Sequence, residues 1–138
     1  MPAVRRGEPA DLAQIRAIQV ASPQAAQWDV TDYLQYRLLV AVEGILVAGF
    51  LVSRTLTAGE SEILNVAVAP EWRRQGVARA LLSALLADTG GAVFLEVRGS
   101  NAAARSFYKS LDFHEVTTRA DYYENPPESA IVMKFHSC

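Results

Sequence analysis

The sequence predicts a mixed α/β domain in which about four helices cover a mostly antiparallel β-sheet of six to seven strands. Two observations support this class. Segments with the alternation of β-strands and segments with helical spacing follow one another in the order β-α-α-β-β-β-α-β-α-β-β along 138 residues. A chain of this length buries roughly two-thirds of its unfolded surface, enough for one core without disulfide or metal staples. We therefore expect a single domain over residues 1–138.

The N-terminal quarter is predicted to contain a short strand and two helices. Ala3 and Val4 form the first strand. A helix begins near Pro9, a residue preferred in first turns, because the apolar residues that follow it recur at helical spacing. Residues 21–36 are irregular, apart from a second helix expected from Thr31.

Three strands are predicted next. Residues 38–42 and 45–51 are rich in β-formers and flank Glu43 and Gly44, which predicts a two-residue turn between antiparallel strands. A further strand is expected over residues 59–69. Its alternate residues point to opposite faces, with Leu64, Val66 and Val68 on one and Ile63, Ala67 and Ala69 on the other.

Helices and strands alternate in the rest of the chain. Apolar residues recur at helical spacing over residues 75–88, which predicts an amphipathic helix, and a strand follows over residues 92–98. Asn101 is expected to cap the next helix. The last two strands cover residues 113–118 and 130–135 and are joined by a polar loop over residues 121–129.

Composition excludes several classes of protein. The chain has 13 basic and 15 acidic residues and a net charge of −2, so it lacks the basic face that a nucleic-acid partner requires. The longest apolar stretch, around residues 44–53, is only ten uncharged residues, far shorter than the roughly 20 residues of a membrane helix. No signal-peptide core follows the N-terminal basic pair. We expect a soluble, cytoplasmic protein with no nucleic-acid or membrane partner.

Cysteine and histidine usage argues against metal and disulfide chemistry. The single cysteine, Cys138, is the last residue, so no intramolecular disulfide or multi-cysteine site forms, and a reducing compartment is expected. His114 and His136 are far apart and have no carboxylate-rich pattern around them. We therefore expect no metal.

Residues 66–79 combine a strand, a short basic turn and a helix start, which suits an anion. A helix N-terminus offers unpaired backbone N–H groups, and Gly76 lets a diphosphate approach the backbone closely. Arg73, Arg74 and Arg79 add charge. The P-loop and dinucleotide patterns are absent, which removes the main support for ATP and NAD. The alternative is that the glycine only lets helix and strand pack closely while the arginines are solvated.

The same residues resemble a known family. Arg73, Gly76 and Ala78 match the signature R/Q-x-x-G-x-G/A of the GNAT superfamily of acetyl-coenzyme A-dependent N-acyltransferases. Further segments look like the RimI type, the bacterial ribosomal-protein-alanine N-acetyltransferases. These segments are residues 95–104, 107–113, 119–123 and 130–133. The likeness runs from about residue 63 to the end and is weak before residue 40.

The resemblance implies a GNAT fold with acetyl-CoA as co-substrate. The pyrophosphate is expected on the amides of residues 74–79, and the pantetheine arm beside Val66, with a backbone N–H there as oxyanion donor. The Asn101 side chain binds coenzyme A in the family; helix capping is an equally compatible role. The residues expected to bind the cofactor are Val66, Ala67, Val68, Arg73, Arg74, Gln75, Gly76, Val77, Ala78, Arg79 and Asn101. Because the family needs no covalent cysteine, we expect direct attack in a ternary complex.

Two residues are expected to be catalytic. Glu96 matches the family's proposed general base, and burial on an apolar strand would favour its protonated form. The alternative is an ion pair with Arg98 or another basic side chain. Tyr108 lies two helical turns after Asn101 and matches the proton donor to the departing thiolate. The alternative is a tyrosine that is only packed in the core.

The acceptor side is less well defined. Tyr122 and Tyr123 lie in the loop that borders the peptide groove in RimI-type enzymes, and Asp121, Glu124 and Glu128 make this loop acidic, which favours an incoming amine. The alternative is a solvated loop that its aromatic residues anchor. Residues 22–36, where the family's substrate-facing helix and loop lie, carry no RimI signature.

One position departs from the family pattern. Asp112 stands where members usually have glycine. If that position has a positive φ, aspartate is among the better substitutes for glycine.

The leading hypothesis is acetylation of a protein N-terminal amine, such as the alanine of a small-subunit ribosomal protein. The alternatives are a GNAT enzyme for a small amine, antibiotic or free amino acid, and a coenzyme A-binding module without catalysis. The acceptor, the acyl-chain preference, the oligomeric state and any partner protein stay open.

Overall fold

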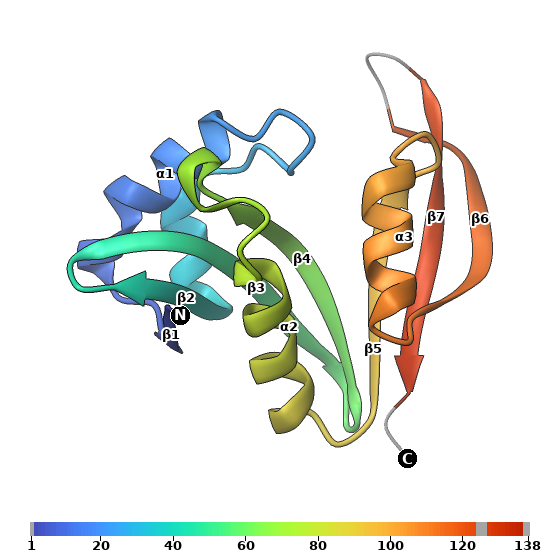
Figure 1. Ribbon diagram of the computed structural model, residues 1–138. Coiled ribbons are helices and arrows are strands. Elements are labelled where there is room, and N and C mark those ends of the chain that lie inside the picture. The colour runs from blue at the N-terminus through green and yellow to red at the C-terminus, as the bar shows by residue number, and fades with distance from the viewer. Residues whose placement is uncertain (1, 124–126, 137–138) are drawn as a thin grey trace. The chain divides into compact units, whose positions relative to one another are not determined.

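The computed structural model describes residues 2–123 and 127–136 (Figure 1). The strands are β1 (Ala3–Arg6), β2 (Arg37–Glu43), β3 (Leu46–Thr57), β4 (Glu60–Val68), β5 (Ala92–Arg98), β6 (His114–Tyr123) and β7 (Glu128–His136). The α-helices are α1 (Leu12–Val20), α2 (Val77–Asp88) and α3 (Ala102–Ser110). Three 3₁₀-helices complete the set: η1 (Pro9–Asp11), η2 (Val30–Gln35) and η3 (Pro70–Trp72).

The described strands form a seven-stranded sheet in the order β1-β2-β3-β4-β5-β7-β6. Neighbours such as β1 and β2, β5 and β7, and β6 and β7 are antiparallel. β4 and β5 are parallel, with Glu60 opposite Ala92 and Glu62 opposite Phe94. The mixed, mostly antiparallel α/β class predicted from the sequence is confirmed.

The chain divides into two compact units. The first contains Met1–Arg54 and Ile63–Asp88, and the second contains Thr55–Glu62 and Thr89–Cys138. Both β3 and β4 run through the two units. The single domain over residues 1–138 stays a prediction.

Helices cover both faces of the strands in the first unit. Leu38 and Val40 of β2 point into a buried cluster with Ile15 of α1 and Tyr33 of η2. On the other face, a Cβ added at Gly49 of β3 would lie 3.0 Å from Val77 and 3.4 Å from Leu81 of α2. Glycine at position 49 therefore allows the close approach of α2 to β3.

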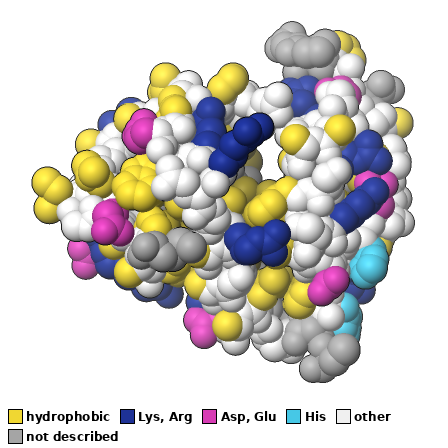
Figure 2. All heavy atoms as spheres, in the orientation of Figure 1, with side chains coloured by type: hydrophobic (Ala, Val, Ile, Leu, Met, Phe, Trp, Pro, Cys, Tyr) yellow, Lys and Arg dark blue, Asp and Glu magenta, His cyan; other side chains and the backbone are white. Residues whose placement is uncertain are grey.

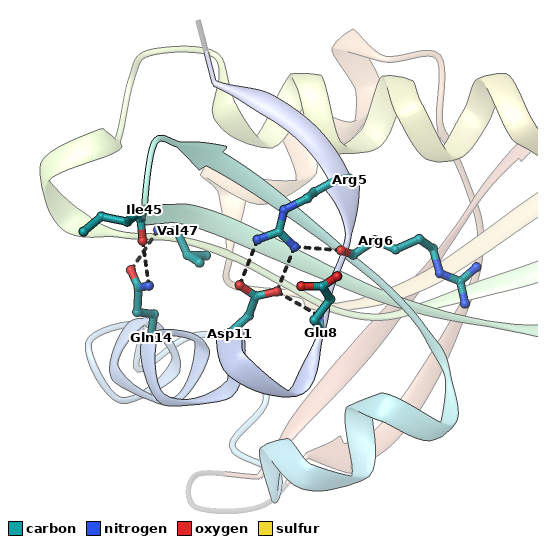
Figure 3. Close-up of polar contacts among 7 residues, drawn as sticks. All are labelled: Arg5, Arg6, Glu8, Asp11, Gln14, Ile45 and Val47. Atoms are coloured by element: carbon teal, nitrogen blue, oxygen red, sulfur yellow. Dashed lines mark hydrogen bonds and ion pairs between the residues drawn. The ribbon is translucent and has the colours of Figure 1, made fainter.

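Polar side chains join the N-terminal elements of this unit (Figure 3). The Arg5 guanidinium donates to both carboxylate oxygens of Asp11, at 2.9 and 3.0 Å, and Asp11 also accepts from the Glu8 amide at 2.8 Å. This arrangement caps the first turn after Glu8.

A second polar contact fixes the β2–β3 turn against α1. The Gln14 carboxamide donates to the Ile45 carbonyl at 3.0 Å and accepts from the Val47 amide at 2.8 Å (Figure 3). The Ile45 side chain itself is 91% exposed. Figure 2 shows hydrophobic side chains at the left of the face, where Figure 1 places this turn.

In the second unit, a chain of aromatic rings joins α3 to β7. The Tyr108 ring lies 5.6 Å from that of Phe113, which lies 5.6 Å from that of Phe135 on β7. Val93 and Leu95 of β5 are buried, whereas Phe94 and Glu96 are half-buried. The predicted alternation along this strand is confirmed, and it places Glu96 on the face opposite Leu95.

The element boundaries differ from the predictions at several places, and three of these differences have a clear local cause. Glu43 pairs with Leu46, so the hairpin turn contains Gly44 and Ile45, not Glu43 and Gly44. Gly44 has φ +59°, which suits the first central position of a type II′ turn and explains the shift of one residue.

The second difference is at the start of α2. This helix begins at Val77, two residues later than predicted, because Arg74 (φ +63°) and Gly76 (φ +81°) are left-handed and interrupt helical geometry. Position 112 also has a positive φ, +69°, as the glycine usual in the family suggested.

The third difference concerns the loop predicted over residues 121–129. β6 extends to Tyr123 and β7 begins at Glu128, so Tyr122 and Tyr123 lie on a strand end and not in a loop. Pairing across this end joins Tyr123 to Glu128. Cross-strand hydrogen bonding therefore continues into a segment whose polar composition is typical of loops.

Within the described residues, no helix is long and apolar enough to cross a membrane. Residues 2–123 and 127–136 contain no group of three or more His, Cys, Asp or Glu side chains that could hold a metal ion, so neither His114 nor His136 belongs to one. Cys138 lies outside the described residues.

Candidate active site

The turn predicted to bind an anion lies in the first unit, between η3 and α2. Two left-handed residues, Arg74 and Gly76, flank Gln75, whose side chain donates to the Glu71 carbonyl at 3.0 Å. The first helical hydrogen bond of α2 runs from the Ala80 amide to the Gly76 carbonyl at 3.0 Å. The amides at the start of a helix lack helical partners, and left-handed residues beside them turn several N–H groups toward one point. The backbone of this turn therefore fits a phosphate group.

The three predicted arginines of this turn do not all have the same surroundings. Arg73 donates from Nε to the Val68 carbonyl at 3.2 Å and from Nη2 to the Ala21 carbonyl at 3.2 Å and the Ser22 hydroxyl at 3.3 Å. Its guanidinium thus joins β4 to the end of α1. Arg74 is exposed and Arg79 is an exposed residue of the first turn of α2.

The predicted pantetheine strand is the part of β4 that leads into this turn. Ala67 is buried, whereas Val66 and Val68 are half-buried, which confirms the predicted alternation. The Ala69 amide donates to the Ala48 carbonyl at 2.8 Å, so β4 stays hydrogen-bonded to β3 up to the turn. This part of β4 is a fixed extended backbone.

The predicted catalytic residues lie in the second unit. Oε1 of Glu96 accepts from Nη1 of Arg119 at 2.7 Å, and the Glu96 side chain is 17% exposed. The carboxyl was expected in its protonated form, with an ion pair to Arg98 or another base as the alternative. The structure shows the ion pair, and the basic partner of Glu96 is Arg119 on β6. Oε2 of Glu96 is buried and has no hydrogen-bond partner among the described residues.

Two arginines stack on the two tyrosines at the end of β6. The Arg119 guanidinium lies 4.4 Å from the ring centroid of Tyr122, and that of Arg98 lies 4.3 Å from Tyr123. The two rings are nearly perpendicular, with centroids 5.1 Å apart. Cation–π contacts of this kind orient side chains that are partly in water. The structure thus brings Glu96, Tyr122 and Tyr123 into one cluster.

The pKa values of Tyr108, Tyr122 and Tyr123 are all raised above the ordinary value for tyrosine. The nearby Glu96 carboxylate, followed by partial burial, raises the pKa of Tyr122. Burial, together with the charge of Glu96, raises the pKa of Tyr123 to about 12. Burial also raises the pKa of Tyr108. At neutral pH each phenol is therefore a hydrogen-bond donor and not a base.

Tyr108 has the features of both of its predicted roles. It is 8% exposed, and its ring packs edge-on against Phe107 and Phe113, at 5.3 and 5.6 Å between centroids. Burial, followed by the nearby Tyr123, raises the pKa of its hydroxyl. The ring is a core residue, and the hydroxyl keeps its proton at neutral pH.

Asn101 caps α3 as predicted. Its Oδ1 accepts from the Ala104 amide at 3.1 Å, so the capping role is confirmed. Of the acidic residues expected near the tyrosines, Glu128 pairs with Arg98 at 3.4 Å and accepts from the Ser100 amide at 2.6 Å. Glu124 and the Asp121 side chain lie outside the described residues.

Comparison with known proteins decides the family. The profile of the Acetyltransferase (GNAT) family matches residues 11–113 of the chain. The chain belongs to the GNAT family.

Specific relatives support the resemblance to RimI-type enzymes. The GNAT chain is 37% identical, over 107 residues, to the [ribosomal protein bS18]-alanine N-acetyltransferase of Escherichia coli (strain K12), a match that covers 73% of this chain and 70% of that protein. The crystal structure of the ribosomal-protein-S18-alanine N-acetyltransferase from Escherichia coli gives a TM-score of 0.86 at 30% identity and covers 100% of this chain and 96% of that one.

A second solved structure has a similar fold. Chaetomium thermophilum Naa20 in complex with a bisubstrate analogue gives a TM-score of 0.86 at 27% identity, covering 98% of this chain and 86% of that one. The predicted GNAT fold and the predicted enzyme class, an acetyl-CoA-dependent N-acetyltransferase, are confirmed.

Two residues near the predicted site had no role assigned from the sequence. They are Arg119, which contacts Glu96, and Asn65, which lies next to Val66 on β4. Arg119 opens the segment 119–123 that resembles RimI enzymes, but no local pattern shows that it pairs with Glu96, 23 positions away. Asn65 lies beside Val66 on β4 and is 6% exposed. A polar residue at a position with buried neighbours on either side, Ile63 and Ala67, was the available signal.

Proposed function

We propose that this GNAT enzyme transfers the acetyl group of acetyl-CoA to the N-terminal α-amine of a protein, with alanine of a small-subunit ribosomal protein as the leading acceptor. Support for the acceptor class comes from relatives that are named for the alanine of ribosomal protein bS18. A ribosomal acceptor is in keeping with action in the cytoplasm.

The first unit supplies the cofactor residues in this proposal. The turn from Arg74 to Gly76 and the first amides of α2 hold the pyrophosphate, since left-handed residues and a helix N-terminus together present N–H groups to an anion. The pantetheine arm extends along Val66, Ala67 and Val68, and a backbone N–H of this strand donates to the thioester oxygen. Asn101, which caps α3, is a further coenzyme A-binding residue in this proposal.

Glu96 and Tyr108 serve the chemical step. The neutral amine attacks the thioester carbon, a C–N bond forms, and the resulting ammonium gives its proton to Oε2 of Glu96, directly or through one water. The C–S bond then breaks and the sulfur leaves as a thiolate. Tyr108, whose burial raises its pKa, donates a hydrogen bond to this sulfur. Because a thiol has an ordinary pKa of about 8.5, a hydrogen bond is favoured over full transfer of the phenol proton.

One observation carries the proposal: Oε2 of Glu96 is buried and has no hydrogen-bond partner among residues 2–123 and 127–136, while Oε1 is held by Arg119. An unsatisfied buried carboxylate oxygen is costly, which makes it a site for a proton donor that arrives with the substrate. Tyr122 and Tyr123, stacked on Arg119 and Arg98, form the adjoining surface for the acceptor peptide.

The test is thiol release from acetyl-CoA by the purified protein. A short peptide beginning Ala-Arg is the acceptor, and the same peptide with a blocked N-terminus is its matched control. Release with the free peptide only, together with a mass increase of one acetyl group on its N-terminus, is the expected result. Equal release with both peptides, or release with small amines alone, would overturn the acceptor class. Cofactor binding without any release would indicate a non-catalytic module.

A further inference from the structure

Asn65 is the centre of a buried polar network in the first unit. Its Nδ2 donates to the Ala26 carbonyl at 2.9 Å, and its Oδ1 accepts from the Ala26 amide at 3.2 Å. The same Nδ2 lies 3.0 Å from the Tyr33 hydroxyl and 3.2 Å from Oε1 of Gln19. One side chain on β4 therefore pairs with both backbone groups of Ala26, as a neighbouring strand would.

The network extends to both ends of the segment that follows α1. The Tyr33 hydroxyl donates to Oε1 of Gln19, and Nε2 of Gln19 donates to the Trp28 carbonyl at 2.6 Å. Gln19 and Asn65 are 4% and 6% exposed, and Tyr33 is fully buried. Every polar atom of the Gln19 and Asn65 carboxamides thus has a partner, which is the condition under which a buried polar network orders its surroundings.

A second anchor lies at the start of this segment. The Arg73 guanidinium donates to the Ala21 carbonyl and the Ser22 hydroxyl, and Arg73 directly precedes the left-handed turn of the proposed phosphate site. Between the two anchors, segment 21–29 has no regular secondary structure and is largely exposed, with Ser22 as its one buried residue. Polar contacts, more than apolar burial, therefore hold this segment.

We propose that Asn65 is a positioning residue that holds segment 21–29 as the acceptor-binding wall beside β4, so that acceptor specificity depends on its carboxamide. The inference rests on the proposed function, because it places the acceptor beside the strand that carries the thioester. Two observations support an acceptor-binding role for this segment. Asn65 directly precedes Val66, the first residue of the proposed pantetheine strand. The segment that Asn65 holds also carries Trp28, whose side chain is 46% exposed. An exposed aromatic residue with a fixed backbone suits contact with a peptide chain.

The network also explains why a polar residue occupies this position. A leucine of similar volume at position 65 would leave the Ala26 amide and carbonyl without partners, and unsatisfied buried backbone groups are destabilising. The two-way pairing with Ala26 sets the backbone of the segment. Apolar contact alone would leave that backbone free to slide along β4.

The test compares Asn65→Asp with wild type in steady-state acetylation of the Ala-Arg peptide. The substitution keeps the shape and Oδ1 but replaces the Nδ2 donor, which contacts Ala26, Tyr33 and Gln19, by an oxygen that cannot donate. We expect the KM for the peptide to rise about tenfold, as the loss of a buried hydrogen bond predicts, and the KM for acetyl-CoA to change less than about twofold. Tyr33→Phe, which removes one hydroxyl from the same network, is the milder second variant and should raise the peptide KM in the same direction. Val52→Ala, a core substitution in the same unit, is the control for lost stability alone and should leave both KM values unchanged.

Hydrogen exchange supplies a readout that needs no acceptor. The amides of segment 21–29 should exchange faster in Asn65→Asp than in wild type, whereas those of α2 should be unaffected. Equal exchange in the two proteins, or parallel changes in the two KM values, would overturn the inference. If wild type acetylates only small amines, the proposed acceptor fails but the inference is still tested, because the same KM comparison is made with the amine that reacts. If wild type acetylates nothing, an unchanged exchange rate refutes the anchoring, and a faster rate leaves the anchor established but excludes its role in an acceptor site.

Discussion

Glu96 on β5 and Arg119 on β6 form an ion pair across the intervening strand β7, with 2.7 Å between Oε1 and Nη1. The registers explain the contact, since Glu96 pairs with Val132 of β7 and Arg119 pairs with Ala130, two residues away on the same face. The guanidinium also stacks on Tyr122. Arg119 therefore orients the carboxylate through one oxygen, and the other oxygen has no hydrogen-bond partner within the described part of the chain.

Replacing Glu96 by glutamine should remove the general base without changing the shape of the site. We expect kcat/KM for peptide acetylation to fall by about two to three orders of magnitude, as is typical for loss of a positioned base. The dissociation constant of acetyl-CoA, measured by calorimetry, should stay within about twofold.

Glu128→Gln is the matched control for this prediction. Glu128 is a second carboxylate of the same unit, but it pairs with Arg98 and the Ser100 amide. Its replacement should lower kcat/KM far less than that of Glu96. A similar loss in both variants would mean that charge in the cluster matters and that Glu96 has no special role.

Tyr108→Phe should lower kcat by about ten- to a hundredfold while the KM for acetyl-CoA changes little, because the ring packing with Phe113 is retained and only the hydroxyl is lost. Burial raises the pKa of Tyr108 above its ordinary value of 10.0, so the hydroxyl keeps its proton as the pH rises to 10. The kcat profile of wild type should therefore show no alkaline decline from this group between pH 8 and about pH 10. A kcat in the variant equal to that of wild type would exclude the hydroxyl from the mechanism.

Gly76→Ala should weaken acetyl-CoA binding. A side chain at φ +81° is strained by about 1–2 kcal/mol, and relief of that strain would move the turn amides away from the phosphate. We expect the dissociation constant to rise about tenfold. Gly44→Ala imposes comparable strain at φ +59° on the β2–β3 turn, where an added Cβ meets nothing within 4 Å. It should lower thermal stability but leave the dissociation constant unchanged, and equal weakening in both variants would contradict the phosphate assignment.

Asp112→Gly should raise the free energy of unfolding by about 0.5–1 kcal/mol, because φ at position 112 is +69° and glycine adopts this conformation without strain. Urea denaturation measures the change. Ala103→Gly, at an exposed position inside α3, should instead lower the free energy by about 1 kcal/mol. Stabilisation by both glycines, or by neither, would show that backbone strain at Asp112 is not the cause.

Local patterns predicted the elements well. The alternation in residues 92–98 matches β5 residue for residue, and Asn101 caps α3. The predictions were less accurate where a loop-like local composition lies in a segment that pairs with a neighbouring strand. The polar residues after position 120 favoured a loop, but hydrogen bonding between β6 and β7 extends both strands into it.

The sequence by itself determined the order of helices and strands, the glycine turn before α2 and the family resemblance, because periodicity, capping and turn conformation depend on residues close together in the chain. Only the tertiary structure decided the partners of the polar side chains. Arg98, two residues from Glu96 on the same strand, pairs with Glu128, whereas Arg119 reaches Glu96 through strand register. Asn65 likewise bonds to Ala26, 39 positions away. Hydrogen bonds and ion pairs act over a few ångströms in space, and distance along the sequence does not show which side chains the fold will bring that close.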